Sequence, residues 1–491
     1  MLLLQAIHRQ AGRNPHKAAL IHNGECWSYA ELAWHIDQSR RHFAAQPLKP
    51  GRTVVLAIRH LAAAWVHGIA LRSLGLNTLC VPTEKGLQDL MLTSIDSIVT
   101  IAGELTPELR AQAAGKNWQL LLAAPLTYPG HAPALPEPVA EGGHILMTSG
   151  TTGRYKMVLR DALDEASSLT LHAEINGISE ASVVYVGEFL KLTAGGYRWP
   201  LISWSVGGTV VFHQGPRPHE AFQSRQLTHA FATPSTLVHL FKAAPGTLPY
   251  CETLRLLVTG GALPKVLAEM AQARLTRQLF TVLASTEALT LGITPYEPHD
   301  GLQWHCIHPS REVQVVDDAG HPRLAGELGL IRVRLLDGLQ GYLDDAEATR
   351  AFFRDGWFYP GDLGVLAADG RLALHGRVTE VINLLGSKIA VAPLEQALQD
   401  QLGAAGVCIF SVPEDGVETL HVVIEPGPPI ARETLEQALK TFLGRGFTRL
   451  RYHLDVPLPR NHMGKVQRAL LRERVVQSQE AASASAASRP R

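Results

Sequence analysis

The chain has 491 residues, of which 45 are Lys or Arg and 45 are Asp or Glu, so its formal net charge at pH 7 is zero. This length exceeds what a single hydrophobic core usually organises, and an apolar fraction of 46% excludes a wholly disordered chain. The balanced charge argues against a general electrostatic grip on nucleic acid or on an anionic membrane.

The cysteines and the N-terminus bear on location. Five cysteines are scattered along the chain without the C-x-x-C spacing of a metal site or redox pair, and we interpret them as reduced thiols of a cytoplasmic protein. The opening Met1-Leu2-Leu3-Leu4 is too short for the apolar part of a secretion signal. No apolar run approaches the roughly 20 residues of a membrane-spanning helix, so we expect no membrane span.

The first two thirds of the chain alternate between short apolar strands and helical patterns. Strands are predicted at 54–57, 209–212 and 254–258, and a helix is predicted from Leu61 to Leu74. Strands separated by helices indicate βαβ units and a largely parallel sheet. The Pro-, Ala- and Gly-rich stretch 124–143 is predicted to be a loop.

The pattern changes in the last third. From about 312 to 375 it favours hairpins, with Asp369-Gly370 as a two-residue turn. Beyond these hairpins, Pro393 begins a predicted helix that ends at Gly403, and a second helix includes Leu435 to Phe442. With intervening strands near 407–410 and 421–424, this part is predicted to be a compact α+β unit.

The segment 148–156, with the sequence TSGTTGRYK, carries the strongest chemical signal. It follows the apolar run 145–147, so a strand leads into a loop of glycines and hydroxyl residues. Glycine lets the backbone approach a ligand closely, and consecutive N–H groups with hydroxyls form a nest for an anion. The predicted polyphosphate ligands are Thr148, Ser149, Gly150, Thr151, Thr152, Gly153 and Lys156. The spacing is not that of a Walker A loop, which disfavours an ordinary P-loop NTPase; a Ser/Thr/Gly linker is the alternative.

Further motifs follow this loop in a fixed order. They are GGALP at 260–264, LASTE at 283–287, FYPGD at 358–362 and PRNHMGKVQR at 459–468. With these pieces the chain resembles, over nearly its whole length, the adenylate-forming superfamily. That superfamily includes acyl- and aryl-CoA synthetases, adenylation domains of nonribosomal peptide synthetases, and luciferase-like AMP-binding enzymes.

The resemblance implies roles for the middle motifs. Gly261 and Ala262 would line the adenine and acyl pockets, Thr286 would contact the α-phosphate, and Glu287 would bind Mg²⁺, a hard ion that prefers oxygen ligands. Thr286 and Glu287 are thereby counted as catalytic. Leu283 stands where relatives often stack an aromatic ring on adenine. Without the resemblance, Thr286 and Glu287 would be interpreted as a helix start with Thr as N-cap.

The later motifs supply the remaining candidate residues. By resemblance, Asp362 would accept the ribose hydroxyls and Arg377 would contact the ribose or the α-phosphate. Glu380 occupies the hinge position, and Gly386 would lie on the pantetheine channel. Lys465 would be the catalytic lysine that bridges the attacking carboxylate and the α-phosphate. On its own, Asp362 fits an Asx-turn, and a lysine such as Lys465 is usually solvated surface.

The resemblance also implies a fold. We expect an α/β protein with a large N-terminal domain of βαβ-type sheets and a hairpin-rich subdomain, followed by a small mobile α+β lid domain. The N-terminal AMP-binding domain is predicted at 1–378, the lid at 379–476 and a disordered Ala/Ser-rich tail at 477–491.

The implied activity is ATP-dependent conversion of a carboxylic acid to an acyl-AMP with release of pyrophosphate, and then transfer to a pantetheine thiol. The thiol would belong to CoA or to a separate acyl carrier protein. The acyl pocket is expected near 187–196, which lacks the gate His of many relatives and the Asp of amino-acid-activating ones. An aryl or fatty-type acid is therefore expected. Transfer of the acyl group to a non-thiol acceptor, or a nucleotide-binding protein without catalysis, are the alternatives, the latter because Tyr155, Met157 and Pro360 depart from the family motifs.

Overall fold

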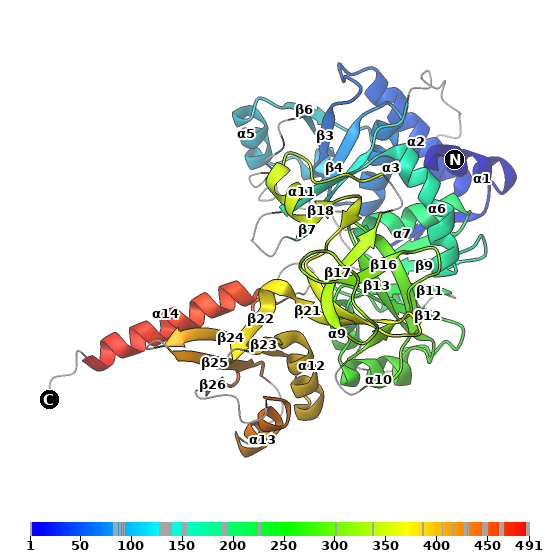
Figure 1. The fold of residues 1–491 in the computed structure, drawn as a ribbon. Helices are drawn as coiled ribbons and strands as arrows, with labels where there is room; N and C mark the ends of the chain where they lie inside the picture. The colour runs from blue at the N-terminus through cyan, green and yellow to red at the C-terminus, as the bar shows by residue number, and fades with distance from the viewer. Residues whose placement is uncertain are drawn as a thin grey trace.

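The computed structural model describes most of the chain, and the statements below concern only the residues it describes. Outside them lie 1, 82–86, 88, 89, 91, 93, 127–139, 150–154, 188–193, 224–226, 245, 247, 300, 301, 336, 337, 385, 386, 405, 415, 416, 427–429, 431, 444–449, 461–465 and 488–491. The architecture is mixed α/β, with a large N-terminal domain built on two sheets, a hairpin subdomain and a small C-terminal domain (Figure 1).

The first large sheet has eight strands in the order β14-β13-β12-β11-β9-β10-β1-β2. They are β1 (Ala18–His22), β2 (Glu25–Ser28), β9 (Val183–Val186), β10 (Thr209–Phe212), β11 (His229–Ala232), β12 (Arg255–Val258), β13 (Leu279–Ser285) and β14 (Leu289–Pro295). The inner strands are parallel, while β2 and β14 are antiparallel edges. The chain places β10 on one side of β9 and β11 on the other, which makes a switch point of the kind where open α/β sheets bind their ligands.

The second large sheet has six strands in the order β6-β5-β3-β4-β7-β8. They are β3 (Thr53–Leu56), β4 (Asn77–Cys80), β5 (Ile95–Thr100), β6 (Gln119–Leu122), β7 (His144–Ser149) and β8 (Tyr155–Arg160). All are parallel except β8, which returns antiparallel to β7. The predicted strands at 54–57, 209–212 and 254–258 are confirmed to within a residue as β3, β10 and β12.

Helices cover and separate these sheets. They are α1 (Leu3–Arg13), α2 (Tyr29–Ala44), α3 (Leu61–Arg72), the 3₁₀ turn Ala102–Glu104, α5 (Pro107–Gly115), α6 (Ala162–Asn176), α7 (Ala194–Ser205), α8 (Glu220–Gln223), α9 (Pro234–Ala243) and α10 (Lys265–Arg274). The start of α2 is set locally, because Ser28 accepts from the Glu31 amide at 3.2 Å while the Glu31 carboxylate accepts from the Ser28 amide at 2.7 Å.

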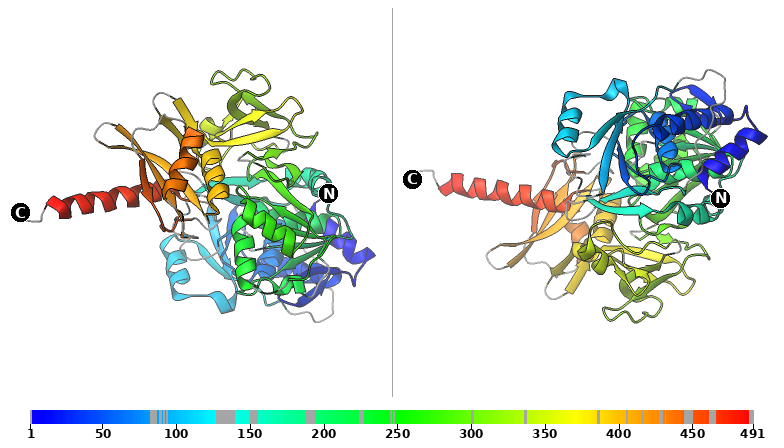
Figure 2. Two further views of the ribbon diagram at one scale, coloured as in Figure 1. Left: turned by 90° about the horizontal axis from the view of Figure 1, so that it is seen from below. Right: turned by 90° about the horizontal axis from the view of Figure 1, so that it is seen from above.

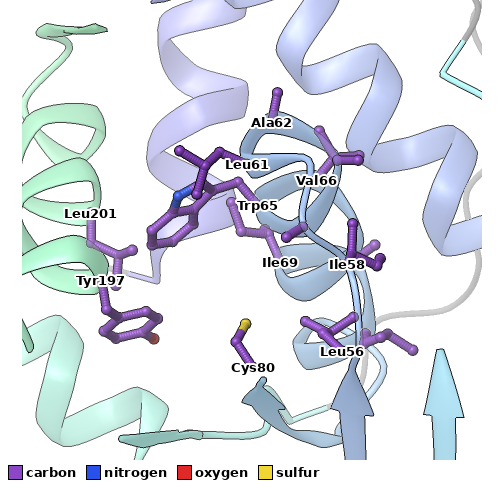
Figure 3. Packing of buried hydrophobic residues seen from close by; sticks show 14 of the residues in the cluster. Leu56, Ile58, Leu61, Ala62, Trp65, Val66, Ile69, Cys80, Tyr197 and Leu201 are labelled. Atoms are coloured by element: carbon purple, nitrogen blue, oxygen red, sulfur yellow. The ribbon is translucent and has the colours of Figure 1, made fainter. Parts of the chain in front are cut away.

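The main core lies around α3, and Figure 3 shows its packing. All twelve residues of α3 are buried, as expected for a helix that is apolar on every side. The Trp65 ring of α3 stacks on Tyr197 of α7, with ring centroids 5.5 Å apart. Tyr197 in turn stacks on His144 at the start of β7, at 4.0 Å. The core therefore connects α7 directly to β7, the strand that leads into the segment 148–156.

A buried ion pair lies beside this core. The Arg72 guanidinium, at the end of α3, is 2.9 Å from the Glu165 carboxylate of α6, and the two side chains are only 5% and 2% exposed. Arg72 also donates to the Tyr197 hydroxyl and to the Gly142 carbonyl. Burial alone disfavours the charged guanidinium, but the Glu165 carboxylate holds the pKa of Arg72 above its ordinary value.

We predict that Glu165→Gln lowers the free energy of unfolding by about 3–5 kcal/mol, because it leaves the buried charge of Arg72 without its counter-ion. Urea denaturation measures this loss. Glu174→Gln is the matched control, since Glu174 is exposed on the same helix. Equal stability of the two variants would contradict the assigned role of the pair.

The hairpin subdomain is a seven-stranded sheet. Its elements are β15 (Trp304–His305), β16 (Val313–Val316), β17 (Leu328–Arg334), α11 (Ala346–Phe352), β18 (Phe353–Arg354), β19 (Trp357–Phe358), β20 (Asp362–Leu366) and β21 (Leu372–Arg377). The predicted hairpin is confirmed, since β20 and β21 are antiparallel and Gly370 has a φ of 83°. Its turn has three residues, 368–370, and not the expected two, because the Ala367 amide donates to the Arg371 carbonyl and the Gly370 amide donates to the Ala367 carbonyl.

The C-terminal domain follows the 3₁₀ turn Val378–Glu380. Its elements are β22 (Val381–Leu384), β23 (Ser387–Ala390), α12 (Val391–Leu402), β24 (Val407–Glu414), β25 (Val417–Ile424), α13 (Arg432–Leu443), β26 (Leu450–His453) and α14 (Arg468–Ala487). Gly403 ends α12 with a φ of 61°, as the sequence predicted. In place of the tail expected from 477, α14 continues to Ala487 and points away from the body (Figure 2). Leu471 and Val475 anchor its first turns in the domain core, and Ala has high helix propensity.

Two contacts define how this domain is held. The Asp400 carboxylate of α12 accepts from the Lys265 amide at 3.2 Å and so caps α10 of the large domain. Arg468 bonds to the carboxylate of Glu395 and lies 3.6 Å from that of Glu380. The expected hinge residue is therefore tied to the start of α14. No helix within the described parts of the chain combines the length and apolar character that crossing a membrane requires.

Candidate active site

The described ends of the segment 148–156 are paired antiparallel strands. Thr148 in β7 is paired across the ladder with Lys156 in β8, and Ser149 is paired with Tyr155. The remaining expected ligands Gly150, Thr151, Thr152 and Gly153 lie outside the described residues. The two strands thus place Thr148, Ser149 and Lys156 at one end of the second sheet.

The turn 286–288 joins β13 to β14, so Thr286 does not begin a helix. The buried Arg160 of β8 donates to the carbonyls of Thr286 and Glu287, the latter at 2.8 Å. The buried Arg311 donates to the Ala288 carbonyl at 2.6 Å. Leu289 follows with a φ of 60°, a conformation rare for a non-glycine residue that persists where surrounding contacts impose it.

The Glu287 carboxylate is buried and has one protein partner among the described residues. Its Oε1 accepts from the Tyr342 hydroxyl at 2.7 Å, while no described group hydrogen-bonds to Oε2. Within those same residues, no cluster of three or more His, Cys, Asp or Glu side chains is arranged to hold a metal ion. A single carboxylate with one oxygen available fits Mg²⁺, which usually takes one or two carboxylates and completes its shell with phosphates and water.

Lys156 lies close to this carboxylate. Its ammonium is 3.4 Å from the centroid of the Phe352 ring and 5.1 Å from that of Tyr342. Burial lowers the pKa of Lys156, and the charge of Glu287 partly offsets that effect. The positive charge of Arg377 also lowers the pKa of Lys156, so the second sheet and the hairpin subdomain come close together here.

Asp362 and Arg377 are cross-strand partners in the β20–β21 hairpin. The Arg377 Nε is 2.9 Å from the Asp362 Oδ1, and Arg377 also donates to the Pro360 carbonyl. Both side chains keep part of their surface exposed. The hairpin therefore presents a carboxylate and a guanidinium together.

Gly261 and Ala262 lie in the turn after β12, at the carboxyl edge of the first sheet, and both are exposed. Gly260 has a φ of 86°, and its position near Thr233 is compact, whereas a Cβ at Gly261 would meet open space. Leu283 packs against the apolar cluster that includes Ala288 and Leu291.

Two sequence-predicted residues of the lid, Gly386 and Lys465, lie outside the described residues. Their flanks are placed. Ser387 pairs with Leu384 in the β22–β23 hairpin. Arg460 and Val466 form an antiparallel main-chain β-bridge, and the Gln467 amide donates to the Pro459 carbonyl at 2.7 Å. The residues on either side of 461–465 are thus paired through their main chains.

The structure brings together Lys156 of β8, Glu287 of the turn 286–288, and the Asp362–Arg377 pair of the β20–β21 hairpin. Sequence reasoning missed the groups that hold them, namely Arg160, Arg311, Tyr342 and Phe352. Arg160 had one usable signal, because it shares a strand face with Lys156 by the two-residue period. The others carry no local pattern, since their partners are distant in sequence.

The comparisons with known proteins identify the family of the chain. The profile of the AMP-binding enzyme family matches residues 7–343, so the chain belongs to that family. It is 30% identical over 347 residues to a salicylyl-CoA synthase / salicylate adenylyltransferase of a Streptomyces species, covering 67% of this chain and 62% of that one. It is 29% identical over 360 residues to a salicyl-AMP ligase / salicyl-S-ArCP synthetase of Mycobacterium tuberculosis, covering 69% and 63%. The matches thus span under two thirds of these relatives' lengths.

Among solved structures, ATP-bound MatB from Rhodopseudomonas palustris is similar with a TM-score of 0.83 and 21% identity, over 96% of this chain and 99% of that chain. At this identity the likeness concerns the fold. It extends through the large domain and the small C-terminal domain, so the fold expected from the motifs is confirmed.

We predict that Arg160→Lys lowers the free energy of unfolding by about 1–3 kcal/mol, because one ammonium cannot replace the guanidinium at both the Thr286 and Glu287 carbonyls. Thermal and urea denaturation measure the loss. Arg354→Lys is the control, since exposed Arg354 donates to the single carbonyl of Ala351. The assignment fails if both variants are as stable as the parent.

Proposed function

We propose that this protein is an acid–thiol ligase: it uses ATP to convert a carboxylic acid to an acyl-AMP and then transfers the acyl group to a pantetheine thiol. The observation that carries the proposal is the convergence of Lys156, Glu287, Asp362 and Arg377 in a member of the AMP-binding enzyme family. These groups match the charges of a nucleoside triphosphate with its metal.

Each group has a task that suits its chemistry. Lys156 and the hairpin 148–156 bind the phosphates, with Thr148, Ser149 and the glycine-rich residues as donors. Asp362 accepts the ribose hydroxyls, and Arg377 orients Asp362 and reaches the ribose or the α-phosphate. Glu287, with Thr286 beside it, holds Mg²⁺, which when bound supplies positive charge to the phosphoryl oxygens.

In the first step an oxygen of the substrate carboxylate attacks the α-phosphorus of ATP. The bond from that phosphorus to the bridging oxygen breaks, pyrophosphate leaves, and an acyl-AMP forms. Charge develops on the phosphoryl oxygens, so catalysis consists mainly of positioning and electrostatic stabilisation. We assign Lys465 to that charge, because it occupies the lysine position of the family motif at 459–468.

In the second step the thiol loses its proton, its sulfur attacks the acyl carbonyl, and the bond to AMP breaks to give a thioester and AMP. Gly386 on the β22–β23 hairpin would let the thiol arm approach the backbone. The lid, proposed at 379–476 after an N-terminal domain at 1–378, turns about Glu380 between the steps.

The relatives support an aryl acid as the first substrate class to test, since both curated proteins carry salicylate or salicyl in their names. A fatty-type acid is the other class. One relative's name includes CoA and the other's includes a carrier protein, so CoA and a separate acyl carrier protein are both proposed acceptors. The five cysteines form no disulfide, which supports a cytoplasmic location.

The decisive measurement is carboxylate-dependent ATP–pyrophosphate exchange with pools of aryl, fatty and amino acids. We expect exchange with one of the first two pools and its loss in Lys465→Ala, because that variant lacks the charge assigned to the α-phosphate. Thioester formation is then followed with CoA and with carrier protein. Exchange without any thioester would favour a non-thiol acceptor, and ATP binding without exchange would favour a non-catalytic protein.

A separate prediction concerns the ribose. Asp362→Asn is expected to weaken AMP binding about 10- to 100-fold, because hydrogen bonds from the ribose hydroxyls to a charged acceptor are lost. Isothermal titration calorimetry measures it. Asp369→Asn, at the exposed end of the same hairpin, should bind AMP normally. Unchanged AMP affinity in Asp362→Asn would remove Asp362 from the site.

A further inference from the structure

Tyr342 contacts both charged groups of the candidate site. Its hydroxyl donates to the Glu287 Oε1 at 2.7 Å, and its ring centroid is 5.1 Å from the Lys156 ammonium. Tyr342 is itself buried. Its main chain is fixed on both sides, because its amide donates to the Thr349 hydroxyl and the next amide donates to the Met157 carbonyl of β8.

Phe352 completes the surroundings of the lysine. The Lys156 ammonium lies 3.4 Å from the centroid of its ring, in a cation–π contact, and the Tyr342 and Phe352 rings meet edge to face at 6.0 Å. Phe352 ends α11, whose N-cap Asp345 fixes the helix three residues after Tyr342. The two rings are therefore held by one short segment of the hairpin subdomain.

Lys156 and Glu287 do not form an ion pair, although they are close enough to influence one another electrostatically. Direct contact between an ammonium and a buried carboxylate lowers their electrostatic energy strongly. Here the carboxylate is occupied on one oxygen by the Tyr342 hydroxyl, and the ammonium is occupied by two aromatic faces. Opposite charges are thus kept adjacent but separate.

We propose that Tyr342 is a positioning residue that prevents Lys156 and Glu287 from forming an ion pair. The Phe352 ring is the second aromatic group that holds the Lys156 ammonium. The carboxylate then keeps an oxygen for a divalent cation, and the ammonium stays available for a phosphate. This inference rests on the proposed function, because it assigns Tyr342 to the binding of the metal–nucleotide complex.

The test is the magnesium dependence of ATP binding by the full chain, measured by calorimetry without any acid so that no turnover occurs. In Tyr342→Phe the ring remains but the Glu287 Oε1 loses its donor and can turn to Lys156. We expect the Mg²⁺ concentration that gives half-maximal enhancement of ATP affinity to rise about tenfold, the effect of losing one charge-assisted hydrogen bond. Metal-free AMP binding should be unchanged.

Tyr29→Phe is the matched control. The Tyr29 hydroxyl is also buried and donates to the Gly208 carbonyl at 2.7 Å, next to the far edge of the first sheet. It should cost stability without changing the magnesium requirement. If Tyr342→Phe loses stability as Tyr29→Phe does and keeps the parental magnesium requirement, Tyr342 is only structural and the proposal is overturned.

Phe352→Leu tests the second aromatic contact of Lys156, since leucine keeps apolar volume and removes the π face. We expect this variant to raise the magnesium requirement and to weaken binding of inorganic pyrophosphate, each about threefold, because the Lys156 ammonium would then pair with Glu287. Parental values for both would overturn the role of Phe352. If the parent itself binds ATP without magnesium dependence, the proposal falls together with the metal role of Glu287. If Tyr342→Phe keeps the parental magnesium requirement while the parent shows acid-dependent exchange, the role of Tyr342 is overturned and the proposed function stands.

Discussion

The candidate site depends on the hydrogen bonds that two buried arginines make to three consecutive carbonyls. Arg160 donates to Thr286 and Glu287, and Arg311 donates to Ala288. Buried carbonyls without donors are costly, so the turn 286–288 is stable only with both guanidinium groups in place. Because Arg160 comes from the second sheet and Arg311 from the start of the hairpin subdomain, the turn also joins three parts of the large domain. The position of the Glu287 carboxylate follows from that junction.

The C-terminal domain makes a polar contact with the large domain. Asp400 caps α10 across the interface, and Arg468 connects the expected hinge Glu380 to the half-buried Glu395. The exposed cap can exchange for water at small net cost, whereas the cores on either side are apolar and remain intact. This division suits the rotation about Glu380 that we propose.

Much of the fold was predictable from local pattern. The strands β3, β10 and β12, the helix α3 and the turn at Gly370 followed from apolar periodicity and turn chemistry. The structure of the C-terminal end was not predictable in this way. Its Ala/Ser-rich composition indicated a disordered tail, whereas α14 continues to Ala487 from a first half that packs on the domain core. Helix propensity and anchoring at Leu471 together outweighed the low-complexity signal.

The sequence by itself determined the residue types of the site and their order along the chain: the hairpin hydroxyls with Lys156, then Glu287, Asp362 and Arg377. Spacing within a motif is a local property, so it is readable without a structure. Only the tertiary structure decided that Tyr342 contacts both Lys156 and Glu287, that the Phe352 ring lies against Lys156, and that Arg160 and Arg311 hold the turn. Arg160 and Glu287 are separated by 127 residues, and Tyr342 and Glu287 by 55. Contacts at such separations arise from the packing of whole sheets against one another, which no local pattern encodes.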